Sequence, residues 1–168
     1  MPDWGLAVMY WLHMLATIAW LGSLFALGLM VIPAARRTLP DSMYAAFLGR
    51  IQISIQRVGW LSLAVLIATG MFQMSAHPAY EGFLSVNNPW AMAIFAKHAV
   101  IGLMVVSSAY VTWVLTPALH RMSFVQAAGG DVDPIERAGL LRRERVALRV
   151  NLVLSVIIIL LTALARVS

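Results

Sequence analysis

Long apolar runs, separated by short clusters of charged residues, divide the chain into four segments. These runs cover about residues 6–33, 58–76, 90–119 and 134–165. Each reaches or approaches the roughly 20 residues that a helix needs to cross a hydrocarbon core of ~30 Å. The pattern therefore predicts an all-α fold, an integral membrane four-helix bundle that forms a single domain over residues 1–168.

Prolines and charged residues set the expected ends of the first two helices. The first is expected to end at Pro33, just before Arg36 and Arg37, whose charges favour the lipid headgroups. The second is expected to end before Pro78, because a proline disfavours helical geometry in the residue that precedes it.

The segments between the membrane runs carry their own signals. Residues 42–56 are typical of a short amphipathic helix at the interface, and residues 120–130 of a polar, flexible connection. Asp133 as N-cap and Pro134 at the first helical position predict the start of the last helix. Residues 134–148 of that helix carry many charges, so we expect them to lie in the cytoplasm.

Composition supports a membrane protein and excludes other classes. Hydrophobic residues make up 61% of the 168 residues and charged residues only 11%. The mean hydropathy of +0.84 lies far outside the balance of a soluble domain. The chain contains no cysteine, which excludes disulfides and thiolate metal sites. The net charge of +5 is not gathered in a basic arm or interleaved with aromatic residues, so we expect no nucleic-acid partner.

The distribution of basic residues predicts the orientation in the bilayer. Residues 36–57 contain four Arg and one Asp, and residues 120–149 contain six Arg and four acidic residues. The opposite connection carries only Glu81, and the N-terminus only Asp3. By the positive-inside rule both basic segments are cytoplasmic, so the N-terminus and the C-terminus lie outside the cell membrane.

Three titratable side chains fall inside the predicted spans and are candidates for function, because such groups are costly in lipid unless they have a partner. They are His13 in the first helix and Lys97 and His98 in the third. At about 1.5 Å of rise per residue, all three lie roughly 10–12 Å below the outer ends of their helices. If these helices are neighbours, the side chains converge in the outer half of the membrane.

Helical spacing suggests how a flat macrocycle would fit there. Trp20 lies on the same stripe as His13, and Gly102 lies one turn from His98 and leaves space beside it. Two opposed histidines would form a bis-histidine b-type haem site. Lys97 points about 100° away from His98. Three alternatives remain for Lys97: it replaces His98 as the iron ligand, it pairs with a haem propionate, or it extends to the membrane surface.

The alternative for His13 is a structural hydrogen bond to a neighbouring helix, which is common for polar side chains in membranes.

A second candidate site consists of Met71, Met74 and His77, spaced at i, i+3 and i+6 at the outer end of the second helix. Thioethers and an imidazole are suitable ligands for Cu(I). Methionine is also ordinary filler of apolar cores, and the chain contains 10 of them.

Two segments resemble a known membrane family. The first comprises Trp11, Leu12, His13, Trp20, Gly22, Leu24, Phe25, Pro33, Arg36 and Arg37, and the second comprises Asn88, Pro89, Trp90 and Lys97. The first is similar to the opening helix of the copper resistance D (CopD-like) superfamily and of the related HemJ-type protoporphyrinogen oxidases. The second is similar to the helix of those families that opens with a tryptophan and carries a lysine.

This resemblance implies a compact bundle and, for the HemJ-type branch, a b-type haem held by a histidine on the first helix and a lysine region on the third. By position these residues are His13 and Lys97. The tryptophan-to-lysine spacing is longer than the oxidases lead us to expect, and His98 follows the lysine directly. We therefore favour the copper resistance D side of the resemblance.

Three functions follow as hypotheses. The first is a multi-pass cell-membrane protein that binds haem b, or else copper, and transfers electrons with a quinone or a redox partner protein. The second is an enzyme, a protoporphyrinogen oxidase that passes electrons to quinone. The third is a non-catalytic small subunit of a larger membrane complex, and each of the three is compatible with a homo-oligomer.

Overall fold

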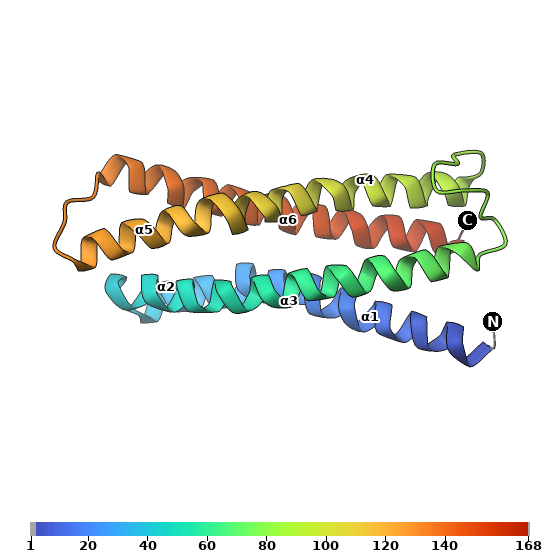
Figure 1. Cartoon of the computed structure of the whole chain (residues 1–168), viewed down its shortest axis with the longest axis horizontal. Coiled ribbons are helices and arrows are strands. Elements are labelled where there is room, and N and C mark those ends of the chain that lie inside the picture. Colours follow the sequence, from blue (N-terminus) through green and yellow to red (C-terminus); the bar gives the residue numbers. More distant parts are fainter. Residues whose placement is uncertain (1–2, 168) are drawn as a thin grey trace.

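A computed structural model describes residues 3–167. For Asp3, Asp41, Ser42, Ala45, Ala46 and Ala127 it describes the backbone alone. Within this part of the chain every regular element is helical, and the helices run antiparallel along one long axis (Figure 1). The elements are α1 (Asp3–Phe25), the π-helix η1 (Ala26–Val31), α2 (Ile32–Thr38), α3 (Asp41–Ser75), α4 (Pro89–Tyr110), the π-helix η2 (Val111–Leu115), α5 (Thr116–Ala127) and α6 (Pro134–Val167).

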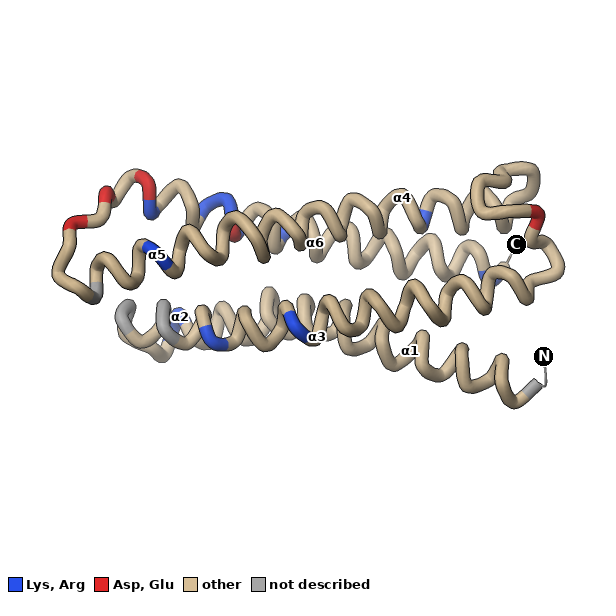
Figure 2. Tube along the Cα trace, viewed as in Figure 1, with Lys and Arg blue, Asp and Glu red and all other residues tan. Residues whose placement is uncertain are grey.

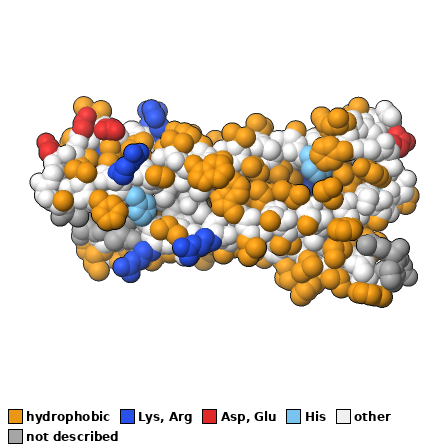
Figure 3. Space-filling model, in the orientation of Figure 1, with side chains coloured by type: hydrophobic (Ala, Val, Ile, Leu, Met, Phe, Trp, Pro, Cys, Tyr) orange, Lys and Arg blue, Asp and Glu red, His pale blue; other side chains and the backbone are white. Residues whose placement is uncertain are grey.

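Four continuous helical segments are long and apolar enough to cross a membrane. They cover Trp4–Thr38, Phe47–Ser75, Pro89–Gln126 and Pro134–Val167. A helix satisfies its backbone hydrogen bonds internally, which lipid cannot do for it. Each segment carries large exposed apolar side chains, which are suited to contact lipid. On the face drawn in Figure 3 such side chains cover much of the surface. The expected all-α membrane four-helix bundle is confirmed.

The first membrane helix is longer than its sequence predicts, because Pro33 does not end it. The π-helix η1 precedes this proline, and the N–H of Ile32 bonds to the carbonyl of Leu27, five residues back. In an α-helix a proline clashes with the carbonyl four residues earlier and lacks the N–H to bond it. The wider π turn changes the hydrogen-bond register just before the proline, and the helix continues to Thr38.

The third membrane helix repeats this arrangement at Pro117. The π-helix η2 ends two residues before this proline, and the N–H of Thr116 bonds to the carbonyl of Val111. The helix then continues as α5 through Ala127, so the expected end at Leu119 and the flexible connection from His120 are wrong. Gly129, with a φ of 77°, ends the helical path instead, because positive φ is readily adopted by glycine.

The expected interfacial helix over residues 42–56 is not a separate element. It is the first part of α3, which runs without interruption into the second membrane span. No proline or glycine pair separates Gln56 from Val58, so nothing in the backbone stops the helix there. Gln52 and Gln56 of this part bond to other helices of the bundle, whereas Arg50, Ser54 and Arg57 are exposed.

Two helix starts depend on side-chain caps. The N–H of Ile135 donates to the Asp133 carboxylate at 2.8 Å, which confirms the expected start of α6 at Pro134. Asn88 caps α4 in the same way, since its side-chain oxygen accepts from the N–H of Ala91 at 2.7 Å.

The helices pack as two pairs, α1 with α3 and α4 with α6. The core where the pairs meet contains Trp20, Leu21, Leu63, Met104 and Ile158. Because each pair supplies part of this core, burial of these side chains holds the two pairs together.

Charged residues separate the two ends of the molecule. Most arginines lie at the end formed by α2, the start of α3, α5 and the start of α6, which we call the basic end (Figure 2). The chain termini and the α3–α4 connection lie at the opposite end, the termini end (Figure 1). There the Arg166 guanidinium lies 5.7 Å from the centre of the Tyr10 ring.

Candidate functional site

His13 lies on α1 and is held from α3. Its Nδ1 is 2.8 Å from Thr69 Oγ1, and this hydroxyl is itself 2.7 Å from the carbonyl oxygen of Val65. The single hydroxyl proton goes to that carbonyl, which can only accept, so the Thr69 oxygen accepts from the Nδ1–H of His13. This fixes the tautomer of the imidazole and leaves Nε2 with a free lone pair.

His98 on α4 is fixed in the same tautomer by its own helix. Its Nδ1 is 2.8 Å from the carbonyl oxygen of Ile94, so Nδ1 carries the proton and donates it. Its Nε2 therefore also presents a lone pair. A histidine that ligates a metal through Nε2 typically donates its other ring N–H to a carbonyl or a comparable acceptor.

The structure brings together the three titratable residues that the sequence singles out. Lys97 and His98 on α4 lie near enough to influence His13 on α1 electrostatically. We call these three residues the histidine–lysine cluster. The cluster lies in the half of the bundle nearer the termini end, because both helices start there.

Close contacts between α1 and α3 fix the position of the His13 side chain. Gln73 Nε2 donates to the carbonyl oxygen of Met9 at 3.1 Å. A Cβ placed on Gly70 would lie 3.3 Å from His13 Cε1, closer than an ordinary van der Waals contact. The absence of a side chain at Gly70 thus allows the imidazole to approach α3 and reach Thr69. Neither Thr69 nor Gly70 stood out in the sequence, because each is an ordinary residue of an apolar helix.

The connection between α3 and α4 covers the cluster from the termini end. The Phe83 ring meets the His98 ring edge-on, with centroids 5.2 Å apart. The His77 ring stacks on Trp90 at 4.1 Å, with 2° between the ring planes. Asn88 Nδ2 donates to the carbonyl oxygen of Ala79 at 3.2 Å and ties the two ends of the connection to each other.

Other residues proposed from the sequence lie elsewhere. Trp20 is buried at the junction of the helix pairs and lines a cavity in the other half of the bundle. Gly102 is exposed, and a Cβ there would meet no atom within 4 Å, so the space beside it is on the outer surface of α4. His120 lies on α5 at the basic end, where a Cβ on Gly49 would be 3.6 Å from its ring.

The candidate copper ligands Met71, Met74 and His77 do not lie on one stripe of a helix. Helix α3 ends at Ser75, so His77 lies beyond it in a turn. Its Nδ1 accepts from the N–H of Ala79 at 3.2 Å, while Met71 is 63% exposed on the outside of the bundle. The i, i+3, i+6 spacing that suggested a copper site requires a helix that continues through His77.

The chemistry of the histidine–lysine cluster suits a metal held by two axial nitrogens. Within residues 3–167, no three His, Asp or Glu side chains come close enough to hold a metal ion together. The cluster offers two Nε2 lone pairs from different helices and one cation. His13 and His98 could supply nitrogen ligands to a haem iron, and Lys97 could pair with a propionate.

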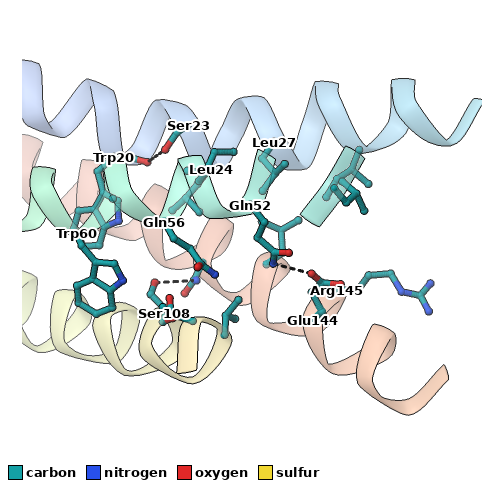
Figure 4. A pocket seen from close by; sticks show the side chains of 18 of the residues that line it. Trp20, Ser23, Leu24, Leu27, Gln52, Gln56, Trp60, Ser108, Glu144 and Arg145 are labelled. Atoms are coloured by element: carbon teal, nitrogen blue, oxygen red, sulfur yellow. Dashed lines mark hydrogen bonds between the residues drawn. The ribbon is translucent and has the colours of Figure 1, made fainter. Parts of the chain in front are cut away.

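A second feature that we did not predict from the sequence is a cavity between the two helix pairs, toward the basic end. Its volume is about 160 Å³. We call it the inner cavity. Trp20 and Trp60 lie at one end of it, Gln56 and Ser108 in the middle, and Arg145 at the other end (Figure 4).

Polar residues of the inner cavity are paired between helices. Gln52 Nε2 donates to Glu144 Oε1 at 2.8 Å, and Gln56 Nε2 donates to Thr116 Oγ1 at 3.0 Å. The two glutamines are four residues apart, which puts them on one face of α3. That spacing was the available signal in the sequence, but an interfacial helix would show it as well.

We compared the chain with known proteins by family model, by curated sequence and by solved structure, and none of the three comparisons found a match.

Proposed function

We propose that this protein is a haem-binding electron-transfer protein of the cell membrane, with haem b held in the outer half of the bilayer. The supporting observation is the shared tautomer of His13 and His98, whose Nε2 lone pairs are both free within one cluster. A bound haem b would supply one-electron redox chemistry, and its potential would depend on the two axial ligands and their hydrogen bonds.

The residues of the chain have distinct tasks in this proposal. His13 and His98 would hold the iron, and Thr69 and the Ile94 carbonyl keep each imidazole in the tautomer that can bind it. Lys97 balances the charge of a propionate. Phe83, which packs on the His98 ring, excludes water from the termini end of the site. The resemblance to the copper resistance D superfamily and the HemJ-type oxidases points to the same helices.

The test is the absorption spectrum of the purified, dithionite-reduced protein, before and after haem is supplied. We expect a Soret band in the wild type and its loss in His13→Ala and in His98→Ala. His120→Ala is the matched control, because it removes a helical histidine at the basic end and should leave the band unchanged. Lys97→Met should retain the band, with weaker haem affinity.

Two results would contradict the proposal. A wild-type protein without a Soret band after haem is supplied would exclude haem binding. A band that survives in the His13→Ala, His98→Ala double variant would show that other residues hold the haem.

A further inference from the structure

The inner cavity contains a buried polar atom without a partner. Asn151 on α6 is 4% exposed and lines this cavity. Its Nδ2 donates to Ser108 Oγ at 3.3 Å, whereas its Oδ1 has no hydrogen-bond partner. A buried acceptor without a donor is destabilising by about 1–3 kcal/mol. Such atoms are rare in folded proteins, and one that lines a cavity can accept from a water or from a ligand with a hydrogen-bond donor.

The size and the lining of the cavity restrict that ligand. Its volume of about 160 Å³ is close to the roughly 150 Å³ of an engineered cavity that binds benzene in another protein. It therefore holds one six-membered ring and is far too small for a porphyrin. Two indoles, of Trp20 and Trp60, lie at one end of the cavity and offer flat apolar surfaces to a ring (Figure 4).

The lining of the cavity is mostly apolar, with amide side chains in the middle and arginines at the basic end. Apolar side chains supply most of the wall, among them Leu24, Leu27, Leu63, Val105 and Leu148. The amides of Gln52 and Gln56 are already bonded to Glu144 and Thr116, which leaves the Asn151 oxygen without a donor. At the basic end the exposed side chains of Arg36 and Arg145 line the cavity. A mostly apolar wall with a buried, unpaired acceptor suits a neutral amphiphile.

We propose that the inner cavity binds the hydroxylated ring of a phenol or hydroquinone with an apolar tail, whose hydroxyl group donates to Asn151 Oδ1. The ring packs near Trp20 and Trp60. A quinone has no hydroxyl to donate, so the site prefers the reduced, hydroxylated form. This site is separate from the histidine–lysine cluster, and its existence does not depend on haem binding.

The test uses decylhydroquinone and the full chain in detergent, with binding measured by isothermal titration calorimetry. We expect saturable binding at one site per chain. The dimethyl ether of the same hydroquinone keeps the ring and the tail but has no donor, and decanol keeps a hydroxyl and a tail but has no ring. Each should bind at least about tenfold more weakly, as the loss of one hydrogen bond or of the ring contacts predicts.

Variants locate the binding in the cavity. Asn151→Leu, which is similar in size and lacks the acceptor, should bind decylhydroquinone about tenfold more weakly. Ser23→Leu fills the cavity from α1 and should abolish binding. Ser54→Leu is its matched control, because Ser54 also bonds a carbonyl of its own helix but is exposed on the outside of α3.

Several outcomes would overturn the inference. They are the absence of saturable binding to the wild type, equal affinity for the dimethyl ether or for decanol, and unchanged affinity in Asn151→Leu. The probes that need no substitution keep the test valid if a variant fails to fold. Because the Soret band of the same samples reports the histidine–lysine cluster, failure here is distinguishable from failure of the haem proposal.

Discussion

At the scale of single residues, two helical glycines have opposite surroundings. Gly70 faces the ring of His13, where an added Cβ would be 3.3 Å from Cε1, whereas Gly102 faces open space. The ring of His13 is rigid and is held by Thr69, so it cannot yield without loss of that hydrogen bond. The two positions therefore separate the intrinsic effect of a glycine-to-alanine change from its effect on the candidate site.

We expect Gly102→Ala to stabilise the protein by about 0.5–1 kcal/mol, because alanine favours a helix more than glycine does. Gly70→Ala gains the same propensity but crowds His13, and overpacking typically is destabilising by about 1–3 kcal/mol. The free energy of unfolding in detergent, measured for both variants, checks this. Equal effects in the two variants would show that His13 does not depend on close approach to α3.

At the scale of elements, hydrogen bonds across the bundle connect the α1–α3 pair to the α4–α6 pair. Gln56 on α3 donates to Thr116, which is buried at the start of α5. Both residues lie in membrane segments, where such bonds contribute about 0.6 kcal/mol on average. The value is small because polar groups find other partners when helices separate in lipid.

A double-mutant cycle of Gln56→Leu and Thr116→Val should give a coupling of about 0.6 kcal/mol and no more than about 1.7 kcal/mol. A cycle of Gln56→Leu with Thr112→Val is the control, since Thr112 bonds the carbonyl of Ser108 on its own helix. We expect no coupling there. Unfolding free energies in detergent supply both values, and equal coupling in the two cycles would contradict a specific bond between the pairs.

The π-helices are a second feature at this scale. Each is followed within two residues by a proline, Pro33 or Pro117, and each lets a membrane helix continue past it. The sequence shows the prolines but not the π turns. Whether a proline ends a helix or is absorbed depends on the packing of the residues beyond it, and that packing is a tertiary property.

At the scale of the whole molecule, the separation of charge between the two ends makes the orientation testable. The chain has no cysteine, so single-cysteine variants carry no background. Asn87 lies in the α3–α4 connection at the termini end, and Ser123 lies on α5 at the basic end. Both side chains are exposed and suitable for labelling.

In intact cells a membrane-impermeant maleimide should label Asn87→Cys and leave Ser123→Cys unlabelled until the membrane is opened. The reason is the positive-inside rule, which keeps the basic end in the cytoplasm. Labelling in the reverse order would show that the topology is inverted. The histidine–lysine cluster would then lie in the cytoplasmic half of the bilayer.

The amino-acid pattern was enough to predict the four membrane helices, their antiparallel order and the starting residue of α6, because lipid imposes length and apolarity on each segment and a cap is a local interaction. It also singled out His13, Lys97 and His98, since titratable groups are conspicuous in apolar runs. Three further features of the sites could be known only from the packing of the helices. The acceptor for His13, the place of Trp20 and the unpaired oxygen of Asn151 depend on which helix faces which, and residues distant along the chain determine that.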